Sequence, residues 1–321
     1  MTTATLPAVN DAVLQAALTG LTASPKSLPP WLFYDERGSD LFEQITALPE
    51  YYLTRTERTI FTAHAEEIFL ALTAPVTIAE LGAGTATKTG ILLRAGSRLQ
   101  SGVLYQPIDV SASALAEADA TLATIPGLRI RPHVANYITE AYAIAREPDT
   151  KILALYIGSS IGNFAPAEAA AILRTLRSHL LPGDALLLGT DLAPGPHKPV
   201  ATLLAAYDDA AGVTAAFNKN ILTRLNRELD ADFVLDNFTH SARWNAAESR
   251  MEMHLESLTA QTVHVAGSSI ALAAGETIHT ENSYKFTPAA LEALLASAGF
   301  AATRAFHDPA QTFAVTLAKA V

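Results

Sequence analysis

The chain has 321 residues, of which 50% are hydrophobic and 17% charged, so it has enough apolar material for a globular core and lacks the composition of a disordered protein. Its formal net charge is −10 and its 22 Lys and Arg residues are scattered, which argues against a nucleic-acid partner because the phosphates would be repelled. It contains no Cys, which excludes disulfides, thiolate nucleophiles and thiolate metal sites.

The sequence also lacks the features of membrane and secreted proteins. No apolar run approaches the ~20 residues that a membrane span needs. The first basic residue is Lys26, so the positively charged start of a signal peptide is missing. The nine His residues show no ligand spacing such as H-E-x-x-H. We therefore expect a cytoplasmic protein with no membrane partner and no metal ion.

In chain order, the first 55 residues contain helical pieces, and from Val76 onward short β-rich runs alternate with helical segments. This alternation is typical of a parallel sheet covered by helices. The expected strands are Val76–Leu81, Val103–Ile108, Leu128–His133, Ile152–Ile157 and Ala185–Thr190. The expected helices are Lys88–Leu99, Ser113–Leu122 and Pro166–Leu180. Five such strands predict an open, doubly wound sheet.

The alternation stops between Ala193 and Phe286. The runs expected there are a helical segment, Ala201–Leu225, and segments of alternating character at Phe233–His240, Arg250–Leu258, Gln261–Val265 and Thr277–Phe286. We interpret them as an insertion that forms a small α+β unit and packs with the first 55 residues as a second domain, since 321 residues are long for one core.

The last part of the chain continues the sheet, with a helix at Pro288–Ser297 and two strand-like runs, Phe300–Phe306 and Thr312–Ala318. A closing antiparallel hairpin of this kind is characteristic of the methyltransferases among Rossmann-like proteins. The predicted fold is therefore an α/β Rossmann-like methyltransferase sheet with a smaller α+β substrate-binding domain. The expected domains are 56–195 with 287–321, and 1–55 with 196–286.

The motif IAELGAGTATKTG, from Ile78 to Gly90, delivers a strand into a glycine turn and then a helix. Glycines let a ligand approach the backbone closely, so a dinucleotide and S-adenosylmethionine are the candidates. A dinucleotide turn reads G-x-G-x-x-G or A, whereas Thr87 stands at the sixth position here. The order Glu80, Gly82, Gly84 matches instead the E/D-x-G-x-G turn of S-adenosylmethionine enzymes.

A second acid, Asp109 in YQPIDVS, ends the next strand 25 residues after Gly84. A carboxylate at this place can accept hydrogen bonds from both ribose hydroxyls of the cofactor. The alternative is that Asp109 caps the following helix, although Ser111 or Ser113 could do so instead.

Seven stretches carry a more specific resemblance, in this order: FYDERGSDLFEQITALPEYYLTRTE, ELGAGTATKT, YQPIDVS, YIGSSIGNF, LLLGTDL, AYDDAAGVTAAFNKNILTRLNRELDADF and IHTENSYKFTPAALE. From about Leu28 to Phe313 the chain resembles the histidine-specific Nα-methyltransferases of ergothioneine biosynthesis. The resemblance implies transfer of three methyl groups from S-adenosylmethionine to the α-amino group of L-histidine, giving hercynine and S-adenosylhomocysteine.

The resemblance also implies which residues bind the cofactor: Glu80, Gly82, Gly84, Thr85, Lys88, Asp109, Asn136, Tyr137 and Gly158. Of these, Lys88 would contact the methionine portion, unless it is a solvated helix residue. Asn136 and Tyr137 replace the Asp and Phe that normally meet the adenine. Asn can still pair with the adenine amino group through its carbonyl oxygen.

For the substrate, the resemblance implies that Tyr34 and Tyr51 surround the amino group and that Tyr51 relays a proton. Their alternative role is an apolar ring with a satisfied hydroxyl group. The remaining substrate-binding residues are Asn163 and Tyr207 for the carboxylate, Glu281 and Ser283 for the imidazole, and Met253. A strand through HTENSYKF would place Glu281 and Ser283 on the same face.

Three other functions are compatible with parts of the sequence. A related enzyme could methylate another aromatic amino acid, such as tryptophan or a prenylated tryptophan, but the polar, compact Glu281 and Ser283 pair suits an indole poorly. A protein that senses the cofactor without catalysis would not need Tyr51, Asn163 and Tyr207 together. An NAD-dependent oxidoreductase is opposed by Thr87. We expect a monomer whose partner is L-histidine.

Overall fold

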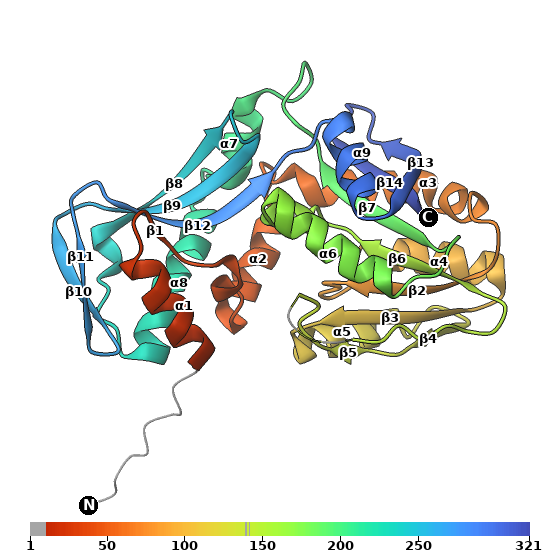
Figure 1. The fold of residues 1–321 in the computed structure, drawn as a ribbon, viewed down its shortest axis with the longest axis horizontal. Helices are drawn as coiled ribbons and strands as arrows, with labels where there is room; N and C mark the ends of the chain where they lie inside the picture. Colours follow the sequence, from red (N-terminus) through yellow and green to blue (C-terminus); the bar gives the residue numbers. More distant parts are fainter. Residues whose placement is uncertain (1–10, 139, 141) are drawn as a thin grey trace, which may run out of the picture. The chain divides into compact units, whose positions relative to one another are not determined.

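The computed structural model describes residues 11–138, 140 and 142–321 (Figure 1). It divides the chain into two compact units. Unit 1 comprises Met1–Tyr52 and Pro199–Ser283, and unit 2 comprises Leu53–Lys198 and Tyr284–Val321. Residues 1–10 of the expected second domain lie outside the described part of the chain. The assignment of cofactor binding to one unit and substrate recognition to the other stays a prediction.

Unit 2 contains an eight-stranded sheet in the order β13-β14-β7-β6-β2-β3-β4, with β5 paired to β3. Its strands are β2 (Val76–Leu81), β3 (Val103–Asp109), β4 (Leu128–Ile130), β5 (His133–Val134), β6 (Lys151–Tyr156), β7 (Ala185–Asp191), β13 (Phe300–His307) and β14 (Phe313–Ala320). Its helices are α3 (Tyr52–Leu70, whose first residue belongs to unit 1), α4 (Thr89–Gln100), α5 (Ala112–Leu122), the 3-10 helix η2 (Ser160–Asn163), α6 (Pro166–Ser178) and α9 (Pro288–Ser297).

The sheet confirms the predicted Rossmann-like methyltransferase fold. Strands β2, β3, β6 and β7 are parallel, and β14 runs antiparallel between β7 and β13. All residues of β2 and β7 are buried, as expected for central strands that helices cover on both faces. The expected strand Leu128–His133 is instead two short strands, β4 and β5. Pro132 stands between them, and it has no N–H group to donate to a neighbouring strand.

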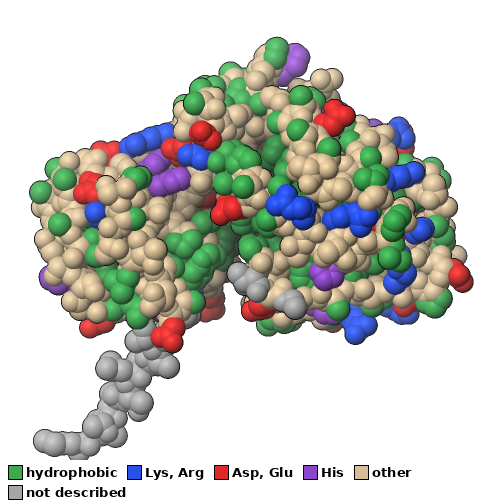
Figure 2. All heavy atoms as spheres, viewed as in Figure 1, with side chains coloured by type: hydrophobic (Ala, Val, Ile, Leu, Met, Phe, Trp, Pro, Cys, Tyr) green, Lys and Arg blue, Asp and Glu red, His purple; other side chains and the backbone are tan. Residues whose placement is uncertain are grey.

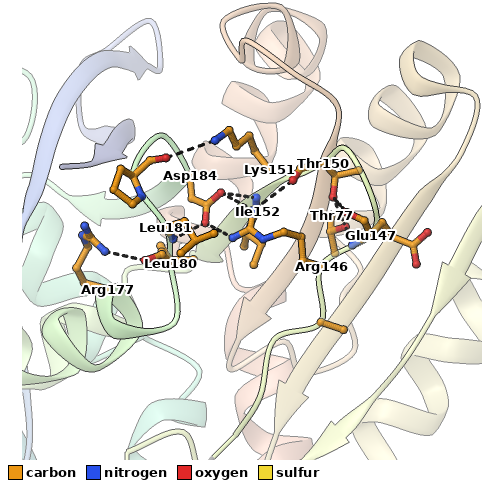
Figure 3. A network of polar contacts seen from close by, with 12 residues as sticks. Thr77, Arg146, Glu147, Thr150, Lys151, Ile152, Arg177, Leu180, Leu181 and Asp184 are labelled. Atoms are coloured by element: carbon orange, nitrogen blue, oxygen red, sulfur yellow. Dashed lines mark hydrogen bonds and ion pairs between the residues drawn. The ribbon is translucent and has the colours of Figure 1, made fainter.

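An ion pair between the buried Asp184 and the half-buried Arg146 joins the loops at the start of β6 and β7 (Figure 3). Arg146 donates two hydrogen bonds to Asp184, at 2.8 Å to Oδ1 and 2.5 Å to Oδ2. The backbone N–H groups of Ile152 and Leu181 donate to the same carboxylate at 2.9 and 2.7 Å. Burial alone would raise the pKa of Asp184, but these four hydrogen bonds lower it.

A second buried carboxylate, Asp191, lies at the opposite end of β7 and is shared by two ammonium groups. Lys198 Nζ lies 2.6 Å from Asp191 Oδ1, and Lys285 Nζ lies 2.8 Å from Oδ2. All three side chains are at most 3% exposed. In the same place the Phe286 N–H donates to the Asp191 carbonyl at 3.0 Å, and the Ala193 N–H donates to Phe286 at 2.8 Å. The segments through which the chain leaves and re-enters unit 2 are therefore fastened to each other.

Unit 1 contains a four-stranded sheet in the order β1-β12-β9-β8 and a hairpin of β10 and β11. Its strands are β1 (Lys26–Ser27), β8 (Phe238–Asn245), β9 (Arg250–Ser257), β10 (Gln261–Val265), β11 (Ser268–Leu272) and β12 (Thr277–Tyr284, whose last residue belongs to unit 2). Its helices are α1 (Asp11–Thr22), α2 (Glu36–Ala47), α7 (Val200–Tyr207), α8 (Val213–Leu229), and the 3-10 helices η1 (Pro30–Phe33) and η3 (Leu235–Asn237). Because β1 pairs with β12, the N-terminal segment and the segment 199–283 belong to one unit.

Two local predictions in unit 1 differ from the structure, and one strand was not predicted. The expected helix Ala201–Leu225 is two helices, α7 and α8, because the chain turns at Gly212. The φ of Gly212 is +74°, which glycine adopts with little strain. The expected strand Phe233–His240 begins only at Phe238, since residues 235–237 form η3. Strand β11, in a stretch with several small residues, was not anticipated.

Two features of the described residues concern membrane spanning and surface charge. No helix in this part of the chain is long and apolar enough to cross a bilayer. On the face drawn in Figure 2, Lys and Arg side chains are scattered among acidic, apolar and other polar ones.

The Arg146 and Asp184 pair predicts a stability effect. Replacing Asp184 by Asn removes the charge that Arg146 and two backbone N–H groups require, so the free energy of unfolding should fall by about 2–4 kcal/mol in urea denaturation at pH 7. Because the pKa of Asp184 is lowered, this contribution is present above the carboxyl group's usual pKa and is lost as the pH falls through the folded-state value.

The matched control is Glu147→Gln, which breaks a pair with Arg129 whose side chains are 33% and 63% exposed. An exposed pair contributes at most about 1 kcal/mol. Equal losses in the two variants would contradict the importance of the Arg146 and Asp184 pair.

Candidate functional site

The glycine turn after β2 has the backbone conformation that its sequence requires. Gly82 and Gly84 have φ of +66° and +53°, in the left-handed region that glycine adopts without strain. A Cβ atom at Gly84 would meet no heavy atom within 4 Å, and one at Gly82 would lie 3.5 Å from the ring of Tyr137. The turn is therefore an open backbone cradle with an aromatic ring beside it.

Glu80 lies beneath this turn and is 1% exposed. Thr89 Oγ1 donates to one carboxylate oxygen at 2.9 Å, and the Tyr105 hydroxyl group donates to the other. Burial raises the pKa of Glu80 to about 8, so its carboxyl group is largely protonated near neutrality. Glu80 thus connects β2, β3 and α4, and we infer that it shapes the turn from below instead of contacting a ligand directly.

Asp109 joins the glycine turn to the end of the neighbouring strand. Its carboxylate accepts the Gly84 N–H at 2.9 Å and the Ser111 N–H at 2.9 Å, and the side chain stays half-buried. The helix that follows is capped by Ser111, whose hydroxyl oxygen accepts the Ala114 N–H at 3.2 Å. The alternative that Asp109 caps this helix is wrong. Each carboxylate oxygen keeps a lone pair that could accept a ribose hydroxyl group.

Tyr137 and Asn136 follow the short strand β5. The Tyr137 hydroxyl group pairs with that of Tyr156 at 3.2 Å, which holds the ring over Gly82. The Asn136 side-chain oxygen accepts the Ile138 N–H at 3.0 Å. The second lone pair of this oxygen could still accept an adenine amino group, so the roles of Asn136 and Tyr137 stay predictions.

Glu57 is a site residue that the sequence interpretation missed. It is fully buried, accepts the Gly158 N–H at 2.9 Å, and lies 2.5 Å from Lys88 Nζ. Lys88 is therefore paired with Glu57 and partly buried, and contact of its remaining ammonium N–H groups with the methionine portion stays a prediction. The sequence did contain a signal for Glu57. It occupies a position of α3 at which helical spacing predicts an apolar residue, between the buried residues Leu53, Ile60 and Phe61.

Asn163 ends η2, directly after β6, and its side chain is half-buried. The loop before it is held by Ser159, whose hydroxyl oxygen accepts the Asp191 N–H at 2.9 Å. A Cβ atom at Gly162 would lie 2.8 Å from the Tyr284 carbonyl oxygen, so this position has no room for a side chain. The Asn163 loop, the shared carboxylate of Asp191 and the start of the returning chain are one packed assembly in unit 2.

In unit 1, aromatic contacts connect the tyrosines that the sequence singled out. The Phe42 ring lies 5.9 Å from the Tyr34 ring and 6.3 Å from the Tyr51 ring, both edge-on. The Tyr51 ring in turn lies 6.4 Å from Tyr207. Tyr51 is 9% exposed, whereas Tyr34 is 41% exposed. The structure therefore brings Tyr34, Tyr51 and Tyr207 into one cluster through Phe42.

The hydroxyl group of Tyr207 reaches β12, where it donates to Ser283 Oγ at 2.7 Å. Glu281 lies two residues earlier on the same strand and is half-buried. Met253 is buried on β9, where its carbonyl oxygen accepts the Thr280 hydroxyl group at 3.0 Å. Asn282, which the sequence did not explain, has a buried side-chain oxygen without a hydrogen-bond partner. Four predicted substrate residues, Tyr34, Tyr51, Tyr207 and Ser283, thus form a continuous group.

A second polar cluster in unit 1 consists of Glu252, His254 and His279, whose possible ligand atoms lie within 4.8 Å of one another. The two imidazole rings are stacked, with centroids 4.7 Å apart and planes at 21°. A metal ion binds in the plane of each imidazole, so nearly parallel rings direct their lone pairs side by side instead of at one point. Glu252 also pairs with Arg250 at 2.7 Å. The cluster is better explained as a stacked pair held by Glu252 than as a metal centre.

A parallel sheet closed by an antiparallel C-terminal strand, with a glycine turn and a carboxylate after its first two strands, defines an S-adenosylmethionine-dependent methyltransferase. A family profile described as histidine-specific, S-adenosylmethionine-dependent methyltransferase matches residues 13–320. The chain belongs to this family.

Named relatives agree with this family. The chain is 47% identical over 311 residues to a histidine N-alpha-methyltransferase of Mycolicibacterium smegmatis, covering 96% of this chain and 95% of the relative. It is 36% identical to ergothioneine biosynthesis protein 1 of Neurospora crassa over 63% of this chain and 23% of the relative. It is 31% identical to a 4-dimethylallyltryptophan N-methyltransferase of Claviceps purpurea over 59% of this chain and 58% of the relative.

The geometry of the turn predicts the effect of Asp109→Ala. Loss of a carboxylate that can accept ribose hydroxyl groups, and that fixes the Gly84 N–H, should weaken S-adenosylmethionine binding by about 1.5–3 kcal/mol in titration calorimetry. The control is Ser111→Ala, which removes the helix cap and should lower the free energy of unfolding by about 1 kcal/mol while leaving cofactor affinity unchanged. Unaltered affinity in a folded Asp109→Ala protein would rule out the ribose role.

Proposed function

We propose that this protein transfers three methyl groups from S-adenosylmethionine to the α-amino group of L-histidine, producing hercynine for ergothioneine biosynthesis. The observation that carries the proposal is a group of three residues in unit 1. The rings of Tyr51 and Tyr207 lie edge-on to each other, and the Tyr207 hydroxyl group donates to Ser283. The family and the high identity to a histidine N-alpha-methyltransferase support the same reaction.

The chain's residues fit the cofactor that the family uses. The open turn at Gly82 and Gly84, the available lone pairs of Asp109 and the ring of Tyr137 would hold the adenosine portion. Gly158 would lie against the cofactor, with its N–H already fixed by Glu57. When bound, S-adenosylmethionine supplies an electrophilic methyl group on sulfur.

The protein's own task is to position a neutral amine for in-line attack on that methyl group. In each transfer an N–C bond forms, the S–C bond breaks, and S-adenosylhomocysteine leaves with the bonding electron pair. Going from the ammonium form of histidine to hercynine releases three protons in all. Tyr51 would accept hydrogen bonds from the amino group and pass protons toward solvent, and Tyr34, which is more exposed, would complete this side of the site.

The remaining residues would fix the rest of the substrate. Asn163 and Tyr207 would donate hydrogen bonds to the carboxylate, and Glu281 and Ser283 would bind the imidazole, with Met253 lining the site. We also propose that the protein acts as a monomer in the cytoplasm, with no nucleic-acid partner. The second candidate, methylation of tryptophan or a prenylated tryptophan, is favoured by the 31% identity to the Claviceps purpurea enzyme.

Mass spectrometry after incubation with S-adenosylmethionine and each free amino acid tests the reaction. We expect histidine alone to gain up to three methyl groups, each adding about 14 Da. Methylation of tryptophan with histidine untouched would overturn the proposal in favour of the second candidate. Cofactor binding without any methylated product would favour a sensing role.

Glu281→Ala tests the imidazole pocket. Removing this carboxylate leaves an imidazole N–H without its partner, which costs on the order of 1–3 kcal/mol, or roughly 5- to 150-fold in kcat/KM for histidine. The same change makes room for an indole, so the ratio of tryptophan to histidine turnover should rise. Ser283→Ala should act in the same direction more weakly, with cofactor affinity as the control for both variants. An unchanged ratio in competition assays would show that Glu281 does not recognise the side chain.

A further inference from the structure

The backbone end of Tyr207 is held as firmly as its hydroxyl group. Tyr207 is the last residue of α7, and side chains often bind the carbonyl groups at a helix end. Here the imidazole of His240, on β8, does so, with Nε2 at 2.8 Å from the Tyr207 carbonyl oxygen. The His240 side chain is 2% exposed.

Two carbonyl groups determine which way every hydrogen bond around His240 points. A carbonyl oxygen can only accept, so His240 Nε2 must carry the proton that faces Tyr207. For the same reason the atom of Asn218 that lies 3.0 Å from the His254 carbonyl oxygen must be the amide nitrogen. That nitrogen also lies 2.8 Å from His240 Nδ1. An amide N–H therefore faces an unprotonated Nδ1, and the arrangement requires a neutral imidazole.

The chain of hydrogen bonds returns to the strand that holds the Tyr207 hydroxyl group. Thr280 Oγ1, on β12, lies 2.7 Å from the side-chain oxygen of Asn218 and 3.0 Å from the Met253 carbonyl oxygen, so its one O–H is shared between these two acceptors. Three residues further along β12, Ser283 Oγ accepts the Tyr207 hydroxyl group at 2.7 Å. Asn218, Thr280 and Ser283 are all at most 3% exposed. Tyr207 is thus fixed at both ends by one buried circuit of His240, Asn218, β12 and Ser283.

We propose that Asn218 and His240 are positioning residues for substrate binding, which hold Tyr207 in place only while His240 is neutral. The inference rests on the proposed function, in which Tyr207 donates to the carboxylate of histidine. Protonation of His240 would bring an N–H group against the amide N–H of Asn218, so that one hydrogen bond is lost and two donors face each other in a buried place.

Both charged and apolar residues of the neighbouring elements affect the protonation of His240. The carboxylates of Asp208, 4.0 Å from Nε2 at the end of α7, and of Asp209 favour the imidazolium, whereas Lys219 on α8 disfavours it. On β9 the residue opposite His240 is the apolar Leu255. Burial outweighs the carboxylates and lowers the pKa of His240, in agreement with the hydrogen-bond directions. Because the folded-state pKa lies below the usual value, the neutral form dominates near pH 7 and is lost as the pH falls.

His240→Gln is the first test, with His179→Gln as the matched control. Burial lowers the pKa of His179 as it lowers that of His240, but His179 is only half-buried and lies in unit 2 after α6, stacked on Tyr142. We expect His240→Gln to raise KM for histidine about tenfold, the equivalent of one or two neutral hydrogen bonds, with KM for S-adenosylmethionine unchanged. His179→Gln should leave both constants unchanged.

The decisive comparison repeats His240→Gln in a Tyr207→Phe background. If His240 acts through the Tyr207 hydroxyl group, the tenfold effect should shrink to less than about twofold once that hydroxyl is absent. A purely structural role would give the same fold-change in both backgrounds, and this result would overturn the proposal. The ratio of histidine affinities between wild type and His240→Gln should also fall toward pH 5.5, while the substrate's own titration cancels in the ratio.

Nitrogen NMR of the ligand-free wild-type protein tests the His240 tautomer directly. The result depends neither on the proposed function nor on the folding of a variant. We expect His240 to be protonated at Nε2 and unprotonated at Nδ1 near neutral pH. A protonated Nδ1 would overturn the circuit. A correct tautomer in a protein that does not bind histidine would instead contradict the proposed function.

Discussion

The buried carboxylate of Asp191 binds the two segments of unit 2 that lie next to the boundaries with unit 1. Asp191 is shared by Lys198 and Lys285, which stand directly beside the junctions at Pro199 and Tyr284. Removal of Asp191 would take away the carboxylate that both buried ammonium groups share, which is costly because a buried charge needs an opposite charge nearby. Within unit 2, the Asp191 N–H also donates to Ser159 in the loop before Asn163.

Carboxylates support the cofactor side of the structure more often than they are available to a ligand. Glu80 is enclosed beneath the glycine turn, and Glu57 is enclosed between Gly158 and Lys88. Asp109 alone of these three stays half-exposed. The division has a physical reason: a buried carboxyl group that accepts hydrogen bonds from fixed protein donors connects neighbouring elements, whereas ligand recognition needs lone pairs that are still available. A sequence motif shows an acidic residue in both cases and does not distinguish an enclosed carboxyl group from one that is available to a ligand.

The sequence predicted the features that depend on local patterning. The apolar run Val76–Leu81, the glycines that follow it and the acid at Asp109 were all found, because strand period, φ requirements and strand-end position are local properties. Glu57 and His240 were not found, since their importance comes from partners 101 and 33 residues away in sequence. The break between α7 and α8 was missed because the apolar spacing continues through Gly212 with no proline to interrupt it. Asn282 is still unexplained.

The position of β14 has a consequence for the order in which the protein can assemble. This strand completes the edge of β7, pairing Lys319 with Ala185 and Phe313 with Asp191. During synthesis the apolar strand β7 is made before its neighbour β14, and the whole segment 199–283 is made between them. An open strand edge is a template for wrong pairing. The methyltransferase sheet therefore cannot be completed until residues 313–320 have been made, after every segment of unit 1.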